Sequence, residues 1–357
     1  MRLALVTYIT AALAFSLRTE AQLTAPKYAN DFLQIGVGAR ALGMSNAAVV
    51  GSDDVTAGYW NPASLLDQKA EMQAGLMHGE YFAGIAKYDY AAVSKRVDST
   101  TVVAVSLIRF GVDDIMNTID LVDQNNNVNY DRITFFSAAD YAAVFSYARM
   151  TNIPGLRVGV NAKIIYRKIG DFASAWGFGL DASARYDYKK WAFGAVARDV
   201  TGTYTAWSYS LDDRTVEVFN QTGNEIPDNN TEVTLPRIVM GASRTFQVGE
   251  KYALRPEINV AMTTDGKRNN IANVGPLSFD PMMGIEGRYS DFLFLRAGVG
   301  NYQSFVTSTG SKEFTVQPNI GLGLRIRKIY IDYALANLGD SETFYSNIFS
   351  LRFNLKQ

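Results

Sequence analysis

Residues Leu156–Lys168 read LRVGVNAKIIYRK and alternate between apolar and polar side chains along almost their whole length. In a β-strand successive side chains point to opposite faces, so this pattern predicts a strand with one apolar and one polar face. The apolar face would carry Val158, Val160, Ala162, Ile164 and Tyr166. The polar face would carry Arg157, Gly159, Asn161, Lys163 and Arg167, with Ile165 as the exception. One such strand also suits a soluble β-sandwich.

Repetition of the pattern separates a membrane barrel from a sandwich. From Glu71 onward we count about fourteen alternating segments, among them Tyr252–Thr263 and Phe349–Lys356. Many run about ten residues or more, which is the length that a tilted strand needs to cross the hydrocarbon layer. Strands of soluble proteins usually have five or six residues. The sequence therefore predicts an all-β protein, a transmembrane antiparallel β-barrel of about 14 strands whose apolar outer face contacts outer-membrane lipid.

The connections between these segments alternate in length. Short turns are expected at Val97–Ser99, Thr151–Gly155, Tyr188–Lys190, Gly249–Lys251, Ser290–Asp291 and Arg327–Lys328. Longer connections lie between them, notably Gly111–Phe135, Tyr204–Leu235 and Asp265–Asp280. An even number of strands with tight turns at one end and long loops at the other is typical of outer-membrane barrels. The short turns and both termini are then expected on the periplasmic side.

The start of the chain predicts export. Arg2, the apolar stretch Leu3–Leu17 and the small residue Ala21 have the pattern of a secretory signal peptide over residues 1–21. A distinct segment would follow over residues 22–69, and the outer-membrane barrel over residues 70–357. The chain has no cysteine, so disulfides cannot stabilise it after export. Its 34 basic and 35 acidic residues give no reason to expect nucleic acid as a partner.

Residues 28–68 do not alternate. They contain Phe32–Met44, with Gly36, Gly38, Arg40 and Gly43, then Asp53 and Asp54, and then Tyr59–Ala63 with Asn61 and Pro62. Lipid cannot satisfy the polar groups of irregular backbone, so such a segment must lie inside the barrel as a hatch or plug. A dinucleotide-binding fingerprint does not fit, because Ala41 stands in place of its third glycine and no βαβ unit follows.

These stretches resemble the amino-terminal signature of the PorV/PorQ family of Bacteroidetes outer-membrane proteins. Asn61-Pro62-Ala63 is also similar to the hatch of FadL-type channels, and Ile331–Leu351 is similar to the family's last hairpin. The resemblance implies a FadL-like barrel of fourteen strands and a part in the type IX secretion system. In that system PorV-like proteins accompany the large SprA translocon and receive the carboxy-terminal signal domain of secreted proteins.

Nothing in the sequence predicts an enzyme, a cofactor or a metal site. The single histidine, His78, is expected at the tip of the first hairpin, without a cysteine or a G-x-S-x-G motif to act with it. Neighbouring acids such as Asp53 and Asp54 point apart in an extended chain. Asp123–Asp131 has oxygen-bearing side chains at alternate positions, but Val128 and Thr134 stand where a calcium loop needs glycine and glutamate. A solvated loop is expected there.

Protein recognition is the function that the resemblance and the long connections favour. Buried aromatic anchors usually dominate an interface. The expected partner-binding residues are the apolar side chains of the outward connections, Ile115, Met116, Phe135, Phe136, Trp207 and Tyr209. The alternative is a FadL-like channel for hydrophobic small molecules. A channel needs an apolar pocket in the lumen, and the polar inner faces of the strands argue against a continuous one. A general porin is disfavoured by the hatch segment.

Overall fold

The computed structural model describes residues 30–122, 127–228, 230–264, 272–306, 311–337 and 345–356, together with residues 266, 268 and 270. The predicted signal peptide and residues 22–29 lie outside the described residues. Among the described residues, no helix is long and apolar enough to cross a membrane.

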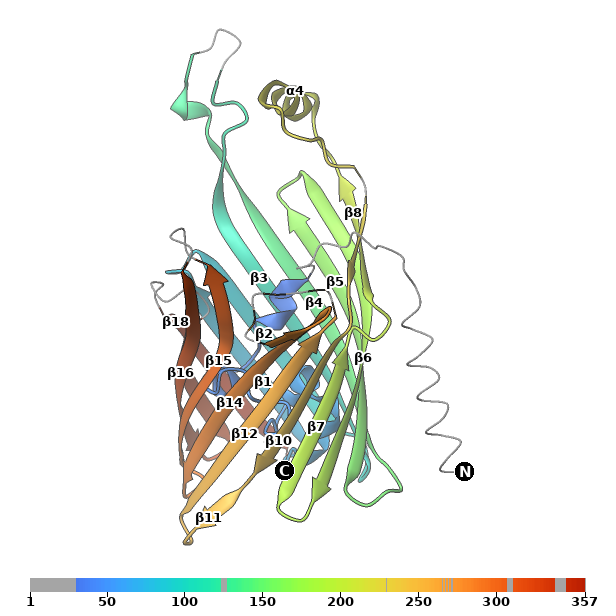
Figure 1. Cartoon of the computed structure of the whole chain (residues 1–357), viewed down its shortest axis with the longest axis vertical. Helices are drawn as coiled ribbons and strands as arrows, with labels where there is room; N and C mark the ends of the chain where they lie inside the picture. The colour runs from blue at the N-terminus through green and yellow to red at the C-terminus, as the bar shows by residue number, and fades with distance from the viewer. Residues whose placement is uncertain are drawn as a thin grey trace.

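A single antiparallel sheet forms most of the molecule and closes on itself, because β1 pairs with both β2 and β18. Figure 1 shows the resulting cylinder. The strands are β1 (Met72–Tyr81), β2 (Ala86–Arg96), β3 (Thr101–Asn117), β4 (Thr134–Met150), β5 (Leu156–Ile169), β6 (Ala173–Tyr188), β7 (Trp191–Arg198), β8 (Thr203–Tyr209), β9 (Thr231–Thr234), β10 (Arg237–Arg244), β11 (Phe246–Val248), β12 (Tyr252–Thr263), β13 (Ala272–Val274), β14 (Leu277–Tyr289), β15 (Leu293–Val306), β16 (Lys312–Ile326), β17 (Ile329–Ala336) and β18 (Ser346–Lys356).

These segments make up 14 barrel strands, as the alternation predicts. Both β7 and β8 pair with β6, so they are two halves of one interrupted strand. The next strand is likewise divided: β9 pairs with β8, β10 with β7, and β11 continues toward β12. The short β13 pairs only with the outer end of β14. The prediction of a closed antiparallel barrel is confirmed.

The two ends of the barrel differ as the sequence predicts. We call one the short-turn end, where β2–β3, β4–β5, β6–β7, β14–β15 and β16–β17 are joined by a few residues and where β1 starts and β18 ends. We call the other the long-loop end. There β3 and β4, each 17 residues long in total, extend farther than the neighbouring strands. The connections predicted at Gly111–Phe135 and Tyr204–Leu235 are therefore shorter than expected, because strand pairing continues into them as far as Asn117 and Tyr209.

The two faces of β5 follow the sequence pattern. Val158, Val160 and Ile164 are exposed on the outer face, and Asn161 and Lys163 are buried on the inner face. The inward charges have partners: Lys163 Nζ lies 2.7 Å from Asp181 Oδ1 and 2.5 Å from Asp199 Oδ1. Ile165, the exception in the pattern, is fully buried in the apolar core.

Residues 30–68 fill the inside of the barrel, and we call them the luminal segment. It consists of the short helices η1 (Asp31–Gln34), α2 (Ala39–Leu42), α3 (Ala57–Trp60) and η2 (Pro62–Asp67), drawn in blue within the cylinder in Figure 1. Inward side chains of the wall satisfy its backbone: Asn161 donates to the Gly58 carbonyl at 3.0 Å, and Asn319 donates to the Leu42 carbonyl at 3.0 Å. The segment lies inside the barrel, where a hatch or plug is expected, and its role as a hatch stays a prediction.

Candidate functional site

Arg40 joins the luminal segment to the barrel wall. It lies in α2, and its guanidinium donates to Asp53 Oδ1 at 2.5 Å, to Asp54 Oδ2 at 3.1 Å and to both carboxylate oxygens of Glu286 at 2.9 and 3.2 Å. Asp54 also pairs with Arg352 of β18. The predicted motif residues Arg40, Asp53 and Asp54 therefore meet in one network, although adjacent carboxylates are expected to diverge in an extended chain.

The wall supplies further members of this network from strands that are distant in sequence. Glu286 of β14 accepts from Arg255 of β12 at 2.9 Å and from Arg296 of β15 at 2.8 Å. Arg296 in turn pairs with Asp332 of β17 at 2.6 Å. Burial alone would raise the pKa of Asp54, but the guanidinium groups of Arg352 and Arg40 outweigh burial and hold that pKa below its usual value. Asp54 is therefore held in its charged form.

The other motif residues shape the backbone of the luminal segment. Gly36 and Gly38 have φ values of 102° and 87°, which only glycine adopts readily. Gly43 lies against Gly321 of the wall, where a Cβ would come within 2.8 Å of the Gly321 Cα. Asn61 caps η2 by accepting from the Ala63 N–H at 3.1 Å, and Pro62 occupies the first helical position, where its missing N–H costs nothing.

A polar vestibule opens above the luminal segment at the long-loop end. Its volume is about 600 Å³. Most of its polar lining consists of side-chain amides, namely Gln34, Asn46, Asn270, Asn301, Gln303, Gln317, Asn319 and Asn337. Within the described part of the chain, Arg237 Nε, Thr263 Oγ1 and Asp280 Oδ1, which belong to lining residues, are buried without a hydrogen-bond partner. The vestibule therefore offers both donors and acceptors.

Four of the six predicted partner-binding residues lie together at the outer ends of β3 and β4. Ile115 pairs with Phe136, and Met116 pairs with Phe135, in register across the two strands. Met116 and Phe135 are 65% and 59% exposed. The ring of Phe136 packs edge-on against Phe172 with 5.2 Å between centroids. These residues are therefore on strands that project beyond the barrel, not in an irregular loop.

Trp207 and Tyr209 lie on β8 and differ from the sequence expectation. Trp207 is only 7% exposed and packs on Ala173 and Ala175, under the guanidinium of Arg167 at 4.9 Å. The side chain of Trp207 therefore points into the barrel and not outward as expected, because β8 turns it inward; its part in partner binding stays a prediction. Tyr209 stacks on Trp207 at 6.0 Å between centroids and is half-buried.

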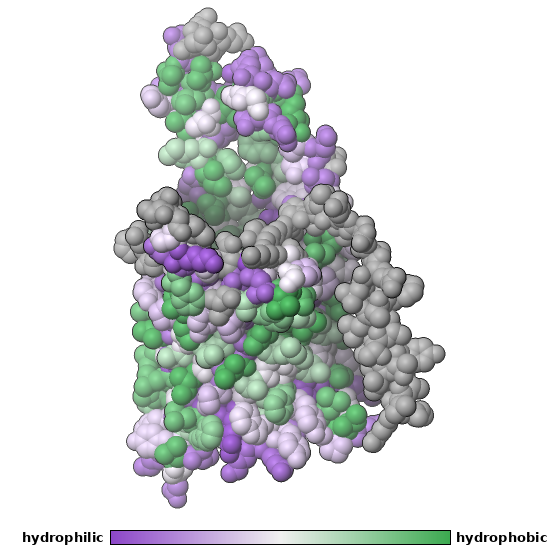
Figure 2. Space-filling view, viewed as in Figure 1, coloured by the Kyte–Doolittle hydropathy of each residue, from purple (hydrophilic) through white to green (hydrophobic). Residues whose placement is uncertain are grey.

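The connection between β8 and β9 contributes a helix that sequence reasoning missed. In α4 (Asp213–Thr222), Asp212 caps the first turn by accepting from the Thr215 N–H at 2.7 Å. Arg214 then reaches the β3–β4 connection, donating to Asp120 at 3.4 Å and to the Val122 carbonyl at 3.1 Å. Figure 1 shows both parts beyond the rim of the barrel, and Figure 2 shows hydrophobic and hydrophilic side chains mixed on this projecting end.

Two further sequence expectations concern polar side chains. His78 is not at a hairpin tip. It is the seventh residue of β1, points outward and contacts Asp89 of β2, so that prediction is wrong. The Asp123–Asp131 loop lies partly outside the described residues. In the whole described part of the chain, no three His, Cys, Asp or Glu residues cluster as metal ligands do.

Solved structures of channel proteins resemble about nine tenths of the chain. The monoaromatic hydrocarbon channel CymD superposes with a TM-score of 0.57 at 13% identity, covering 90% of this chain and 98% of CymD. The toluene transporter TbuX of Ralstonia pickettii gives 0.55 at 13% identity, covering 89% and 98%. A FadL homologue of Pseudomonas aeruginosa gives 0.53 at 12% identity, covering 88% and 97%.

The chain has the fold of the FadL-like outer-membrane barrels. At these identities the likeness concerns the fold. No protein-family model matches the sequence, and no curated protein matches it.

Proposed function

We propose that the chain is a non-enzymatic outer-membrane component of the type IX protein secretion system, of the PorV-like kind. In this role its long-loop end faces outward and its short-turn end faces the periplasm. It docks to a large SprA-like translocon barrel and receives secreted proteins through their carboxy-terminal signal domains. The resemblance of the luminal segment and the last hairpin to the PorV/PorQ family supports the secretion system in particular.

The projecting β3–β4 hairpin carries the proposal. About 9–11 tilted residues suffice to cross the membrane, and these strands have 17 each. The extra residues form a paired ladder outside the hydrocarbon layer, and this ladder exposes Met116 and Phe135. Protein interfaces typically have large apolar side chains at their centre and polar groups around them. The link through Arg214 adds α4 to the same surface.

The vestibule beneath this hairpin supports a polypeptide ligand better than an apolar solute. An extended peptide carries one donor and one acceptor per residue, and amide side chains such as Asn301 and Gln303 can satisfy both. A hydrocarbon would leave the buried polar atoms of Arg237 and Asp280 without partners.

The second candidate is a FadL-like channel for hydrophobic small molecules. Its support is that CymD and TbuX, which share the fold, are described as a monoaromatic hydrocarbon channel and a toluene transporter. Against it stand the amide-rich outer vestibule and the ion pairs that cross the lumen around Glu286.

Site-specific photo-crosslinking separates the two candidates. A photoreactive phenylalanine analogue is placed at Phe135 of the tagged chain, and the matched control carries it at Phe314 on the outer wall, which is equally exposed at 57%. After irradiation of membranes, adducts are purified and identified by mass spectrometry. We expect position 135 to capture a very large barrel or secreted proteins that share a carboxy-terminal domain, and position 314 to capture neither.

Two outcomes would contradict the proposal. One is equal protein capture at both positions, which would make the hairpin no different from the rest of the wall. The other is a purified chain that carries a bound fatty acid or aromatic solute and yields no protein adduct at position 135, which would favour the channel.

A further inference from the structure

The two ends of the barrel carry charges of opposite sign. The turns and strand ends of the short-turn end hold thirteen basic and four acidic side chains, within residues 95–100, 149–157, 185–191, 244–251, 288–291 and 325–328. The two connections that project at the long-loop end hold eleven acidic and two basic side chains, within residues 113–132 and 210–232. A chain whose formal net charge is only -1 is therefore strongly polarised along the barrel axis.

Most of the cations at the short-turn end have no partner. Arg185 and Arg288 do pair, with Asp187 and Asp291. Eight of the thirteen basic side chains form neither an ion pair nor a side-chain hydrogen bond within the described part of the chain, namely Lys95, Arg149, Lys189, Lys190, Arg244, Lys251, Arg327 and Lys328. All of these are exposed except Arg244, which is half-buried. Their positive charge is therefore available to a ligand.

Aromatic side chains of the outer wall lie next to these cations. Lys189 Nζ is 5.2 Å from the centroid of the Tyr188 ring, and the guanidinium carbon of Arg244 is 5.5 Å from that of Trp191. Further exposed aromatic side chains stand near the same end, namely Tyr147, Tyr186, Phe193, Phe246, Tyr252, Tyr289 and Phe292. Tyrosine and tryptophan gather at the level of lipid head groups. The unpaired cations therefore lie in the head-group layer.

Two of the unpaired cations point outward from regular strands. Lys95 of β2 follows Ser94, and Arg149 of β4 follows Ala148. Ser94 and Ala148 are fully buried on the inner face. Because successive side chains of a strand point to opposite faces, Lys95 and Arg149 face the surroundings of the barrel and not its lumen. Lipid head groups surround the wall at this level, so the position favours a lipid over a soluble acidic partner.

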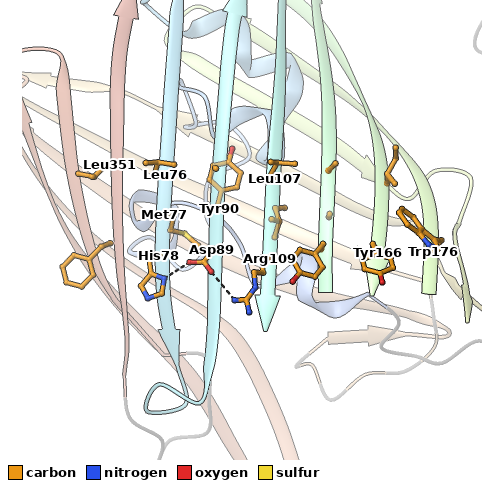
Figure 3. Close-up of a pocket in the computed structure, with 17 residues that line it drawn as sticks. Leu76, Met77, His78, Asp89, Tyr90, Leu107, Arg109, Tyr166, Trp176 and Leu351 are labelled. Carbon is orange, nitrogen blue, oxygen red and sulfur yellow. Dashed lines mark hydrogen bonds and ion pairs between the residues drawn. The ribbon is translucent and has the colours of Figure 1, made fainter. Parts of the chain in front are cut away.

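Outward cations nearer the long-loop end of the same wall already have partners. Arg109 Nη1 lies 3.5 Å from Asp89 Oδ2, and Lys87 Nζ lies 3.3 Å from Asp113 Oδ2. Figure 3 shows the contact of Arg109 with Asp89 on the outer wall. Lys87 and Arg109 are therefore one lysine and one arginine whose charges are compensated, and they match the uncompensated pair at the short-turn end.

We propose that the short-turn end binds anionic phospholipids, of the phosphatidylglycerol kind, in the leaflet that it faces. The phosphate oxygens accept hydrogen bonds from the unpaired lysine and arginine side chains, in the charge-assisted pairs that oxyanions form with these groups. A zwitterionic head group brings an ammonium of its own, which this excess of cations repels. In the orientation proposed above the leaflet is the periplasmic one. The site is separate from the partner surface of the long-loop end and involves no partner protein.

Quenching by brominated lipids measures the preference at one position of the wall. Because the chain has no cysteine, a fluorophore can be attached at Val103→Cys alone, and Val103 of β3 is in register with Lys95. The labelled chain is reconstituted into phosphatidylcholine vesicles that contain brominated phosphatidylglycerol or brominated phosphatidylcholine. We expect phosphatidylglycerol to bind about fivefold more strongly, equivalent to about 1 kcal/mol for one cation near the surface. The preference should vanish in about 1 M salt, which screens the charges.

Two matched double variants test which cations are responsible. Lys95→Gln with Arg149→Gln removes the unpaired cations beside the reporter, and we expect the preference to be lost. Lys87→Gln with Arg109→Gln removes the compensated pair, and we expect the preference to stay. Quenching by brominated phosphatidylcholine, which should be equal in all chains, verifies insertion of each variant.

Three results would overturn the proposal. One is equal quenching by both lipids in the labelled chain without further substitutions. Another is a preference that survives in Lys95→Gln with Arg149→Gln, or that is lost equally in both double variants. The third concerns the choice of ligand: a photoreactive residue at Lys95 would capture an acidic protein in native membranes in place of lipid.

Discussion

Replacing Arg40 with glutamine removes the one side chain of the luminal segment that pairs with three carboxylates. The guanidinium is 14% exposed and donates to Asp53, Asp54 and Glu286. Removing one partner of a buried ion pair costs about 3–5 kcal/mol. Glu286 keeps Arg255 and Arg296 as partners, so we expect a smaller cost. The free energy that opposes release of the segment should fall by about 2–3 kcal/mol. That change raises the population of the released state about 30- to 150-fold.

Thiol labelling measures this population, because the chain has no cysteine of its own. Ser52→Cys introduces a nearly isosteric thiol at a buried position of the segment, where the serine hydroxyl donates to the Ala48 carbonyl at 2.8 Å. A maleimide reagent then reacts in proportion to the fraction of time that the segment is released. The matched control is Lys69→Gln, which removes an exposed positive charge next to the segment. Equal labelling rates in Arg40→Gln and Lys69→Gln would refute the reasoning.

Other substitutions and conditions probe the same interior. Gly298→Ala places a methyl group on the backbone of Met44, so we expect a loss of about 1–3 kcal/mol, seen as a lower temperature of barrel unfolding on gels; Gly287→Ala, where the nearest atom would be 3.6 Å away, should change little. Asn61→Ala removes the η2 cap and a buried hydrogen bond, and should cost about 1–3 kcal/mol in the same assay. The pKa of Asp54 is lowered, so its stabilising contribution is complete above the unfolded value near 3.9 and is lost only as the pH falls through the lower folded pKa. Cleavage of the segment by pepsin, which is active in acid, should therefore stay slow at pH 4 and accelerate only in stronger acid.

The barrel could be predicted because its signal is local. Alternation along Leu156–Lys168 depends only on which residues face lipid and which face the lumen, and this constraint acts separately on every strand. The same reasoning predicts the interior position that the structure gives to residues 30–68, since irregular backbone has no place in lipid. Strand ends were predicted less well at Asn117 and Tyr209, because pairing between strands outside the membrane depends on the partner strand and not on contact with lipid.

The network around Arg40 depends on contacts between distant segments and left no local signal. Arg40 and Glu286 are 246 residues apart, and the sequence gives no register that would bring them together. Trp207 was assigned to the outer surface because its stretch resembles a loop, and the β8 strand instead turns it toward Arg167.

The luminal segment precedes all the barrel strands in the sequence, yet two of its partners lie on β18, the last strand. Ala39 N–H donates to Ser350 Oγ at 2.8 Å, and Asp54 pairs with Arg352, both on the strand that completes the cylinder. A chain that stops before this strand lacks these two contacts of the luminal segment. The pairing of β1 with β18 that closes the barrel therefore also completes the set of contacts that hold the luminal segment.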